Sequence, residues 1–268
     1  MPLTIDILIS TINQRIHHVP QLLMSPLSGV RYIVSHQTDG NYPAPQILHD
    51  RQDVEIFTMN GRGLSRNRNN AIAHATADII VIADDDNRYT HQHVLNITQA
   101  YTAHPEADII CFCATDYNDN PLKRYPQGTL PYTKALKQGY YPSSIELTMR
   151  RTSVQGKIAF NTAFGLGAPQ LCAGEEDVFM TDAMRMGLTC LFVNSPIVST
   201  SPITTGSTLL TNPQLQITKG ATFRYCYGLM PALWRAVKEA AYHALRHHAN
   251  PFTIFHNMLK GITTHLAQ

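Results

Sequence analysis

The 268-residue sequence lacks most features of exported, membrane-spanning or nucleic-acid-binding proteins. No basic segment precedes an apolar run near the N-terminus, and no apolar run reaches the roughly eighteen residues that a spanning helix needs. Twenty-one lysines and arginines against nineteen aspartates and glutamates give a net charge of only +2, which does not indicate a nucleic-acid partner. We therefore expect a cytoplasmic protein that binds no nucleic acid.

Paired cysteine motifs are also missing. The five cysteines are an odd number and contain no Cys-x-x-Cys pair. Cys111 and Cys113 lie two residues apart in an apolar run, so in a strand both would point to one face. This pattern predicts reduced, partly buried thiols.

The chain does contain a regular alternation of apolar runs and helical spacings. At 29.9 kDa it is long enough for one large α/β domain with a small appendage. Apolar, β-branched runs predict strands at residues 3–11, 30–35, 54–58, 79–83, 107–114 and 188–193, and helical spacing predicts helices at 19–24, 64–75, 91–104 and 175–187. Residues 145–151 alternate as in an antiparallel strand, whereas 116–142 has neither period. We expect an α/β fold with a mixed, mostly parallel sheet.

Three adjacent carboxylates, Asp84, Asp85 and Asp86, follow the apolar run at 79–83. Ligands of parallel sheets bind outside the carboxyl ends of strands. Adjacent carboxylates repel one another, and a Mg²⁺ or Mn²⁺ ion that carries substrate phosphates would offset that charge. The alternative is a solvated acidic turn.

The segment around these carboxylates resembles a known family. Gly63-Leu-Ser-Arg-Asn-Arg-Asn-Asn-Ala-Ile, then an apolar strand, then Ala-Asp-Asp-Asp is similar to the nucleotide-sugar domain of bacterial family-2 glycosyltransferases, over about residues 3–210. The resemblance implies a Rossmann-like GT-A fold at 1–210, with a nucleotide-binding part at about 1–115 and an acceptor and catalytic part at about 116–210. It also implies that Asp84 and Asp86 meet the ribose and the diphosphate-bound Mn²⁺ or Mg²⁺.

Further donor contacts are expected where other predicted strands end and where the helix after Gly63 begins. A helix N-terminus beside guanidinium groups suits a diphosphate. The residues that we assign to the nucleotide sugar are Thr11, Asn13, Arg15, Gln37, Arg62, Ser65, Arg66, Asp84 and Asp85. Arg66 is the first choice for a phosphate contact, and Arg68 is interpreted as a solvated side chain.

An acidic helix start supplies the candidate general base. Glu175, Glu176 and Asp177 stand where helical spacing begins, and carboxylates there stabilise a helix dipole by about 0.3–1 kcal/mol without any catalytic role. Transfer with inversion needs a group that takes the acceptor proton. The family's Gly-Glu-Asp pattern implies Glu176 as this base, or Asp177 if the register shifts by one residue.

One position departs from the family's pattern. Relatives often have a histidine, a metal ligand or phosphate contact, where this chain has Thr200. Metal binding would then rest on Asp86, the donor diphosphate and water.

Residues 211–268 form a predicted C-terminal extension of amphipathic helices. Apolar residues recur every four positions from Leu229 to Leu245 and again after Pro251, and basic residues outnumber the single acid Glu239. Packing on the catalytic domain is one explanation. Peripheral contact with the inner face of the cell membrane, where a lipid-linked acceptor would lie, is the other.

These observations together predict an inverting glycosyltransferase that moves a sugar from a nucleotide sugar, most simply a UDP-sugar, to a hydroxyl of a lipid-linked glycan. A sugar-phosphate nucleotidyltransferase is the first alternative, but residues 10–15 lack the glycine-rich loop that such chemistry uses. A nucleotide-sugar-binding module without turnover is the second, because of Thr200.

Overall fold

The computed structural model describes residues 2–133, 136, 139–201, 209 and 211–264, which fold into two compact units. The first unit comprises Met1–Arg62, Arg66–Ala159 and Asp182–Pro202. The second comprises Gly63–Ser65, Phe160–Thr181 and Ile203–Gln268. The second unit thus joins a segment from the middle of the chain to the C-terminal helices, a grouping that the order of the predicted elements did not indicate.

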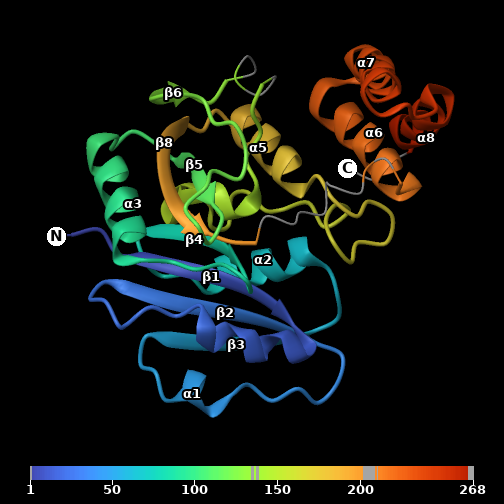
Figure 1. Ribbon diagram of the computed structural model, residues 1–268. Helices are drawn as coiled ribbons and strands as arrows, with labels where there is room; N and C mark the ends of the chain where they lie inside the picture. The colour runs from blue at the N-terminus through green and yellow to red at the C-terminus, as the bar shows by residue number, and fades with distance from the viewer. Residues whose placement is uncertain (1, 134–135, 137–138, 202–208, 210, 265–268) are drawn as a thin grey trace. The chain divides into compact units, whose positions relative to one another are not determined.

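An eight-stranded sheet forms the centre of the first unit (Figure 1). The strands are β1 (Ile5–Ile12), β2 (Val30–Thr38), β3 (Val54–Asn60), β4 (Ile79–Asp84), β5 (Ile109–Thr115), β6 (Thr129–Pro131), β7 (Leu147–Arg150) and β8 (Cys190–Ser199). They lie in the order β3-β2-β1-β4-β7-β5-β8-β6. Strands β6 and β7 run antiparallel to their neighbours and the other pairs are parallel, which confirms the predicted mixed, mostly parallel sheet.

The two central parallel strands are apolar almost throughout, because both faces of the sheet are covered. Every residue from Ile79 to Ala83 in β4 is fully buried, and the apolar residues of β1 are buried to a similar degree. Asp6 is the exception in β1. Its carboxylate accepts hydrogen bonds from the Arg31 guanidinium at 3.0 Å and from two backbone N–H groups, so the buried charge is compensated.

Short helices connect these strands. They are η1 (Asn13–Gln21), α1 (Gln46–His49), α2 (Leu64–His74), α3 (His91–Ala103), η3 (Ser144–Glu146), α4 (Arg151–Val154) and α5 (Glu175–Arg185). Helices α2, α3 and α5 confirm the predictions for those segments. Thr90 caps α3, because its hydroxyl accepts from His93 N–H while the His93 ring accepts from Thr90 N–H.

The predicted α-helix at 19–24 is wrong. The chain forms the 3₁₀-helix η1 instead, and this helix ends before Leu22. Ile16 and Val19 are both fully buried, and their spacing of three residues fits the three-residue turn of a 3₁₀-helix.

Strand β8 extends beyond the predicted segment 188–193 and ends at Ser199. Its pairing with β5 contains register shifts near Cys113. Because a register shift interrupts the regular alternation of side chains, the sequence pattern stops before the strand does. Cys111 and Cys113 are buried and all five thiols are free, as predicted.

The excursion at 116–142 is tied to the sheet by one buried carboxylate. Glu146 is fully buried in η3 and accepts hydrogen bonds from the phenols of Tyr125 at 2.7 Å and Tyr140 at 2.9 Å. Lys123 forms an ion pair with the same carboxylate at 2.9 Å. The described part of the excursion contains β6 and is otherwise irregular.

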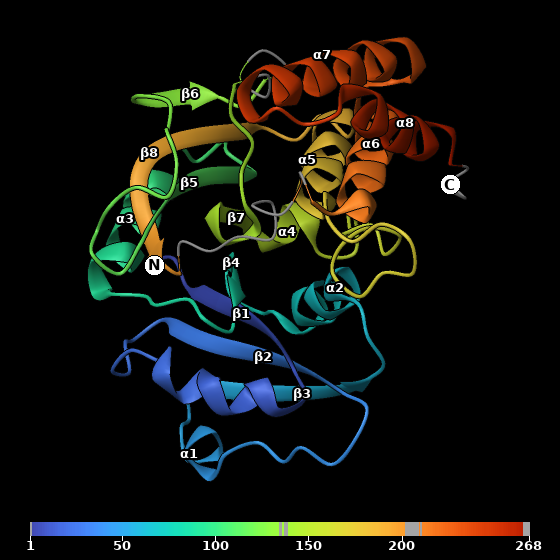
Figure 2. The same cartoon turned by 45° about the vertical axis from the view of Figure 1, so that its right-hand side comes forward.

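Three helices dominate the second unit: α6 (Pro213–Tyr227), α7 (Leu229–His247) and α8 (Pro251–Thr263). They pack against one another, in orange to red in Figure 2. Sequence analysis missed α6, whereas α7 and α8 confirm the predicted helical extension. None of the described helices is long and apolar enough to cross a bilayer.

Two glycines allow α6 and α8 to approach closely. A Cβ atom on Gly220 would lie 2.0 Å from the Met258 carbonyl oxygen, and one on Gly261 would lie 1.8 Å from the Ile217 carbonyl oxygen. Both obstacles are backbone atoms, which cannot rotate away. The two helices can therefore pack this closely only because Gly220 and Gly261 have no side chain.

Replacement of Gly261 by alanine tests this packing. Alanine favours an isolated helix by about 1 kcal/mol over glycine, yet we expect Gly261→Ala to lower the free energy of unfolding by about 1–3 kcal/mol because the helices must separate. Gly139→Ala is the control, since a Cβ there meets no atom within 4 Å. Chemical denaturation of both variants measures the effect, and a more stable Gly261→Ala protein would contradict the packing argument.

Candidate functional site

The three carboxylates at the end of β4 have different partners, and Asp85 is the most firmly held. Its carboxylate accepts a hydrogen bond from the Thr11 hydroxyl at 2.7 Å and forms a bidentate ion pair with the Arg15 guanidinium. Asp85 is buried, whereas the Arg15 side chain is half exposed. The bonds to Asp85 raise the pKa of Arg15. Thr11, Arg15 and Asp85, all assigned to the donor, thus form one network.

Asp84 is held by a buried arginine. Nη2 of Arg68 lies 3.0 Å from Asp84 Oδ1 and 2.7 Å from the Ser144 hydroxyl. Arg68 is only 1% exposed, so its interpretation as a solvated side chain is wrong. A buried guanidinium needs acceptors, and the end of β4 and the start of η3 provide them.

Asp86 differs from its two neighbours, because it forms no ion pair within the described part of the chain. Its carboxylate accepts a single hydrogen bond, from the Asn87 amide at 3.2 Å. Burial raises the pKa of Asp86, and the charges of Asp84 and Asp85 raise it further, against the opposing effect of Arg15. A cation beside Asp86 would offset this cost.

Asn87 connects all parts of this acidic turn and was missed in the sequence analysis. It is buried, its side-chain oxygen accepts from Asp84 N–H at 2.7 Å, and its amide nitrogen donates to Asp86 and, at 3.1 Å, to the Thr200 hydroxyl. Thr200, for which the sequence resemblance implies a histidine in relatives, is therefore linked to Asp86 through Asn87. The only signal in the sequence was the position of Asn87 directly after the triplet.

The carboxyl ends of β1, β2 and β3 bring other predicted donor contacts to the same edge of the sheet. Asn13, with a φ of 50°, accepts from His36 Nε2 through its carbonyl oxygen at 3.0 Å and from Asp39 N–H through its side chain at 3.1 Å. Arg62 pairs with Asp39 at 2.8 Å. Gln37 is buried at the end of β2.

Arg66 is an exposed guanidinium at the first turn of α2. It has no hydrogen-bond or ion-pair partner in the described residues, and it lies over Gly61, where a Cβ atom would be 2.9 Å from its Nη1. Gly61 has a φ of +100°, which other residues rarely adopt. The Arg66 guanidinium thus lies exposed near the N-terminus of α2, where an anion would be favoured.

Ser65, also assigned to the donor, is buried in the second unit. Its hydroxyl donates to the Phe164 carbonyl oxygen at 2.6 Å, and Leu64 N–H donates to the Leu166 carbonyl oxygen at 2.8 Å. These bonds fasten the start of α2 to the Phe-Gly-Leu-Gly segment. Ser65 therefore has a structural partner in this structure.

The acidic helix start lies in the second unit. Helix α5 begins at Glu175, as predicted, after Gly174 with a φ of +84°. Glu175 is buried beside Gly165, where a Cβ would come within 3.3 Å of the Glu175 carboxyl carbon. Glu176 and Asp177 are partly exposed. Of the three carboxylates, Glu175 is therefore the least accessible.

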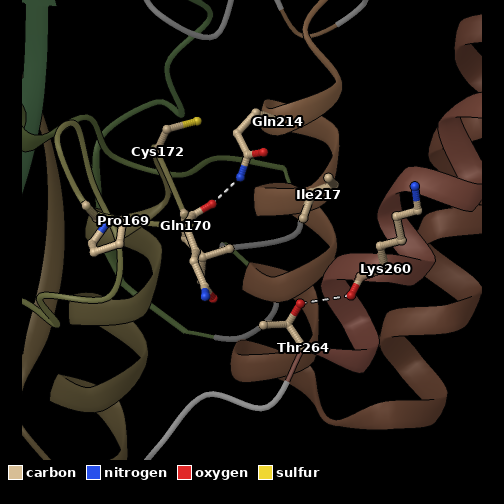
Figure 3. Close-up of a pocket in the computed structure, with 9 residues that line it drawn as sticks. Pro169, Gln170, Cys172, Gln214, Ile217, Lys260 and Thr264 are labelled. Carbon is tan, nitrogen blue, oxygen red and sulfur yellow. Dashed lines mark hydrogen bonds between the residues drawn. The ribbon is translucent and has the colours of Figure 1, made fainter.

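The linings of two cavities include none of the site residues described above. One, of about 390 Å³ in the second unit, is lined by the 168–172 loop and by residues of α6 and α8 such as Gln214, Ile217 and Lys260 (Figure 3). The other, of about 330 Å³ in the first unit, lies beside Asn69 and Gln155. Neither contains a predicted site residue, so the site identified by its chemistry is the acidic strand end.

The residues at this strand end fit a divalent cation only if the substrate supplies part of the coordination. Among the described residues, no three histidine, cysteine, aspartate or glutamate side chains converge on one point. Asp86, with Asp84 beside it, offers carboxylate oxygens of the kind that Mg²⁺ and Mn²⁺ accept. One or two carboxylates with phosphate oxygens are the usual arrangement for these ions.

Comparisons with known proteins identify the family. The model for glycosyl transferase family 2 matches residues 29–165, which is half of the chain and contains α2, the acidic turn and β5. The chain therefore belongs to glycosyl transferase family 2. This membership favours glycosyl transfer over nucleotidyl transfer. No curated protein matches the sequence.

Solved structures agree with this fold. A crystal structure of residues 1–349 of S. aureus TarS superposes with a TM-score of 0.59 at 13% identity, covering 97% of this chain and 90% of that one. A structure of the same TarS segment in complex with UDP gives 0.54 at 12%, covering 93% and 74%. A further TarS structure gives 0.55 at 11%, covering 92% and 44%. At such low identity these matches establish the fold, which is the expected GT-A type.

The buried arginine gives the site's first prediction. Arg68→Met should lower the free energy of unfolding by about 2–4 kcal/mol, because it leaves Asp84 and the Ser144 hydroxyl without their cationic donor. Arg62→Met, which breaks the exposed pair with Asp39, should leave stability almost unchanged. Urea denaturation at neutral pH measures both. Equal stability of the two variants would show that Arg68 does not hold the acidic turn.

Proposed function

We propose that this protein is an inverting glycosyltransferase that transfers a sugar from a nucleotide sugar, a UDP-sugar, to a hydroxyl group of a glycan acceptor. The observation that carries the proposal is the acidic end of β4, where two carboxylates are paired with arginines and Asp86 has no such partner among the residues that the structure describes. Membership of glycosyl transferase family 2 supports the reaction class. The UDP complex of the structural neighbour TarS supports UDP as the nucleotide.

The donor would bind along the carboxyl ends of the first strands. The nucleoside would meet the β1 and β2 ends near Asn13 and Gln37, and the diphosphate would lie toward Arg66 and Asp86. Arg66 is suited to this role because its guanidinium is exposed and has no partner among the described residues. A phosphate there would also gain from the positive end of α2.

A bound Mn²⁺ or Mg²⁺ would neutralise charge that develops on the leaving diphosphate. We assign Asp86 as its main protein ligand and Asp84 as a second. Asp85 stays with Thr11 and Arg15, so its role is to hold the turn. Asn87 would orient Asp86, because its amide donates to that carboxylate.

The acceptor hydroxyl needs a base, and we assign Glu176 first with Asp177 as the alternative. Each would take the proton as the acceptor oxygen attacks the anomeric carbon, and the leaving diphosphate would depart from the opposite face. Both carboxylates are partly exposed at the N-terminus of α5.

We further propose that the acceptor is a lipid-linked surface glycan and that the protein acts at the cytoplasmic face of the membrane. The basic C-terminal helices support this location, since they combine apolar and cationic side chains without a bilayer-spanning segment. A binding module without turnover is the competing proposal, which Thr200 favours because a hydroxyl is a poor substitute for the family's histidine ligand.

The metal assignment predicts that Asp86→Ala abolishes the Mn²⁺-dependent part of UDP binding and leaves the fold intact, because Asp86 follows the buried strand. Asp50→Ala is the matched control, as Asp50 is exposed and lies far along the chain from the acidic turn. Calorimetric titration of UDP with Mn²⁺ and with a chelator measures the difference. Unchanged Mn²⁺-dependent binding by Asp86→Ala would refute the assignment.

The base assignment predicts that Glu176→Gln slows single-turnover sugar transfer by roughly 10²–10⁴-fold with little change in donor affinity, because glutamine cannot accept the proton. In the alternative register Asp177→Asn shows this loss instead. A structural role predicts only about 0.3–1 kcal/mol of lost stability.

Asp182→Asn, in the same helix, controls for removing a carboxylate from α5. Transfer at the parent rate by both Glu176→Gln and Asp177→Asn would rule out the acidic helix start as the base. Donor binding with no transfer by the parent protein, across a panel of nucleotide sugars and glycan acceptors, would favour the binding module.

A further inference from the structure

Helix α7 exposes its large apolar side chains. Met230 is 73% exposed, Trp234 65%, Val237 46% and Leu245 82%. Their spacings of four, three and eight residues place all four on one side of an α-helix with 3.6 residues per turn. We call these four residues the α7 outer face.

The opposite side of α7 is buried and consists mostly of small residues, with Leu233 partly buried beside them. Ala232, Ala236 and Ala240 are the buried apolar residues of the helix. They pack in a cluster with Ile254, Met258 and Ile262 of α8. A helix that served only to cover its neighbours would bury its larger apolar side chains, since burial of a leucine-sized side chain contributes about 1.5–3 kcal/mol. Packing within the described part of the chain therefore does not explain why the α7 outer face is apolar.

Two exposed cations of α7 follow residues of this face in the sequence. Lys238 and Arg246 are exposed on α7, next in sequence to Val237 and Leu245. The one acid of the three helices, Glu239, forms an ion pair with Lys219 and lies 3.1 Å from His243, so its charge is offset inside the unit. The pKa of Glu239 is lowered by Lys219 although burial opposes this, and the carboxylate stays ionised.

The sequence concentrates cationic charge in this part of the chain. Residues 211–268 contain six lysines and arginines and one glutamate, whereas the rest of the chain contains fifteen basic and eighteen acidic residues. The small overall charge of +2 thus conceals a basic C-terminal region attached to an acidic remainder.

We propose that the α7 outer face docks on an anionic phospholipid bilayer, with Trp234 and its apolar neighbours in the headgroup boundary and Lys238 and Arg246 among the lipid phosphates. Apolar side chains flanked by lysine and arginine are the composition that lies in this boundary. A second copy of the chain is a poorer occupant, because pairing of two such faces would bring cations of like sign together.

The close packing of α6 and α8 at Gly220 and Gly261 gives α7 a firm support. The proposed function places the protein at a membrane, and the α7 outer face is the surface that would contact it. This inference therefore rests on the proposed function for its biological role. Its physical basis, the exposed apolar face and its cations, does not depend on donor chemistry.

Trp234 makes the test direct, since it is the only tryptophan of the chain. We expect its fluorescence emission to shift to the blue when vesicles containing phosphatidylglycerol are added to the full-length protein, and to stay unchanged with phosphatidylcholine alone. High salt should reduce the shift, because it screens the cations. An unchanged emission with anionic vesicles would overturn the proposal.

Two matched variants localise the surface. Val237→Glu with Leu245→Glu keeps the fluorophore and should lower vesicle binding in flotation by about tenfold or more. Ile47→Glu with Leu95→Glu makes the same change at two exposed apolar side chains elsewhere, and should bind like the parent. Equal binding by the two double variants would overturn the assignment to α7. So would a lipid-free dimer of the parent that only the first variant dissociates.

Binding of UDP by the parent protein, measured in the same buffer, separates this inference from the proposed function. Vesicle binding without UDP binding would support the docking surface and contradict the donor chemistry. UDP binding without vesicle binding would contradict the docking surface alone.

Discussion

The repulsion among three consecutive carboxylates is the constraint on which the candidate site depends. Asp84–Asp86 can stand together at the end of β4 only because other segments bring donors to them. Arg15 comes from η1, Arg68 from α2 and Asn87 from the turn itself. Each carboxylate thereby receives a different partner, so the three side chains differ in their surroundings. Asp85 is paired with Arg15 and Asp84 with Arg68, whereas Asp86 forms no ion pair among the described residues and is the carboxylate that we propose for a ligand.

The sequence was sufficient to predict the central sheet and the acidic end of β4. The apolar run at 79–83 is long, β-branched and followed by acids, so a buried strand with a polar carboxyl end was the simplest prediction, and β4 confirms it. The same argument succeeded for β1 and β2, whose polar ends carry Asn13 and Gln37. These features are local, and local patterns can be interpreted from one sequence.

Features that depend on distant partners could not be predicted. Arg68 became a buried anchor because Ser144, 76 positions away, meets its guanidinium. Helix α6 was missed because its buried side includes Gln216, Thr218 and Gly220, which form no apolar stripe. The apolar stripe of α7 was recognised correctly. Only the structure revealed that alanines pack inward and that most of the stripe is exposed.

The most direct test of this account is a crystal structure of the protein with UDP and Mn²⁺, in which anomalous scattering locates the metal. The account predicts one manganese ion bound by an Asp86 carboxylate oxygen and by the diphosphate, with Asp85 still paired with Arg15 and Asp84 with Arg68. Manganese and diphosphate bound elsewhere, or a metal held by Asp85 after its separation from Arg15, would contradict it.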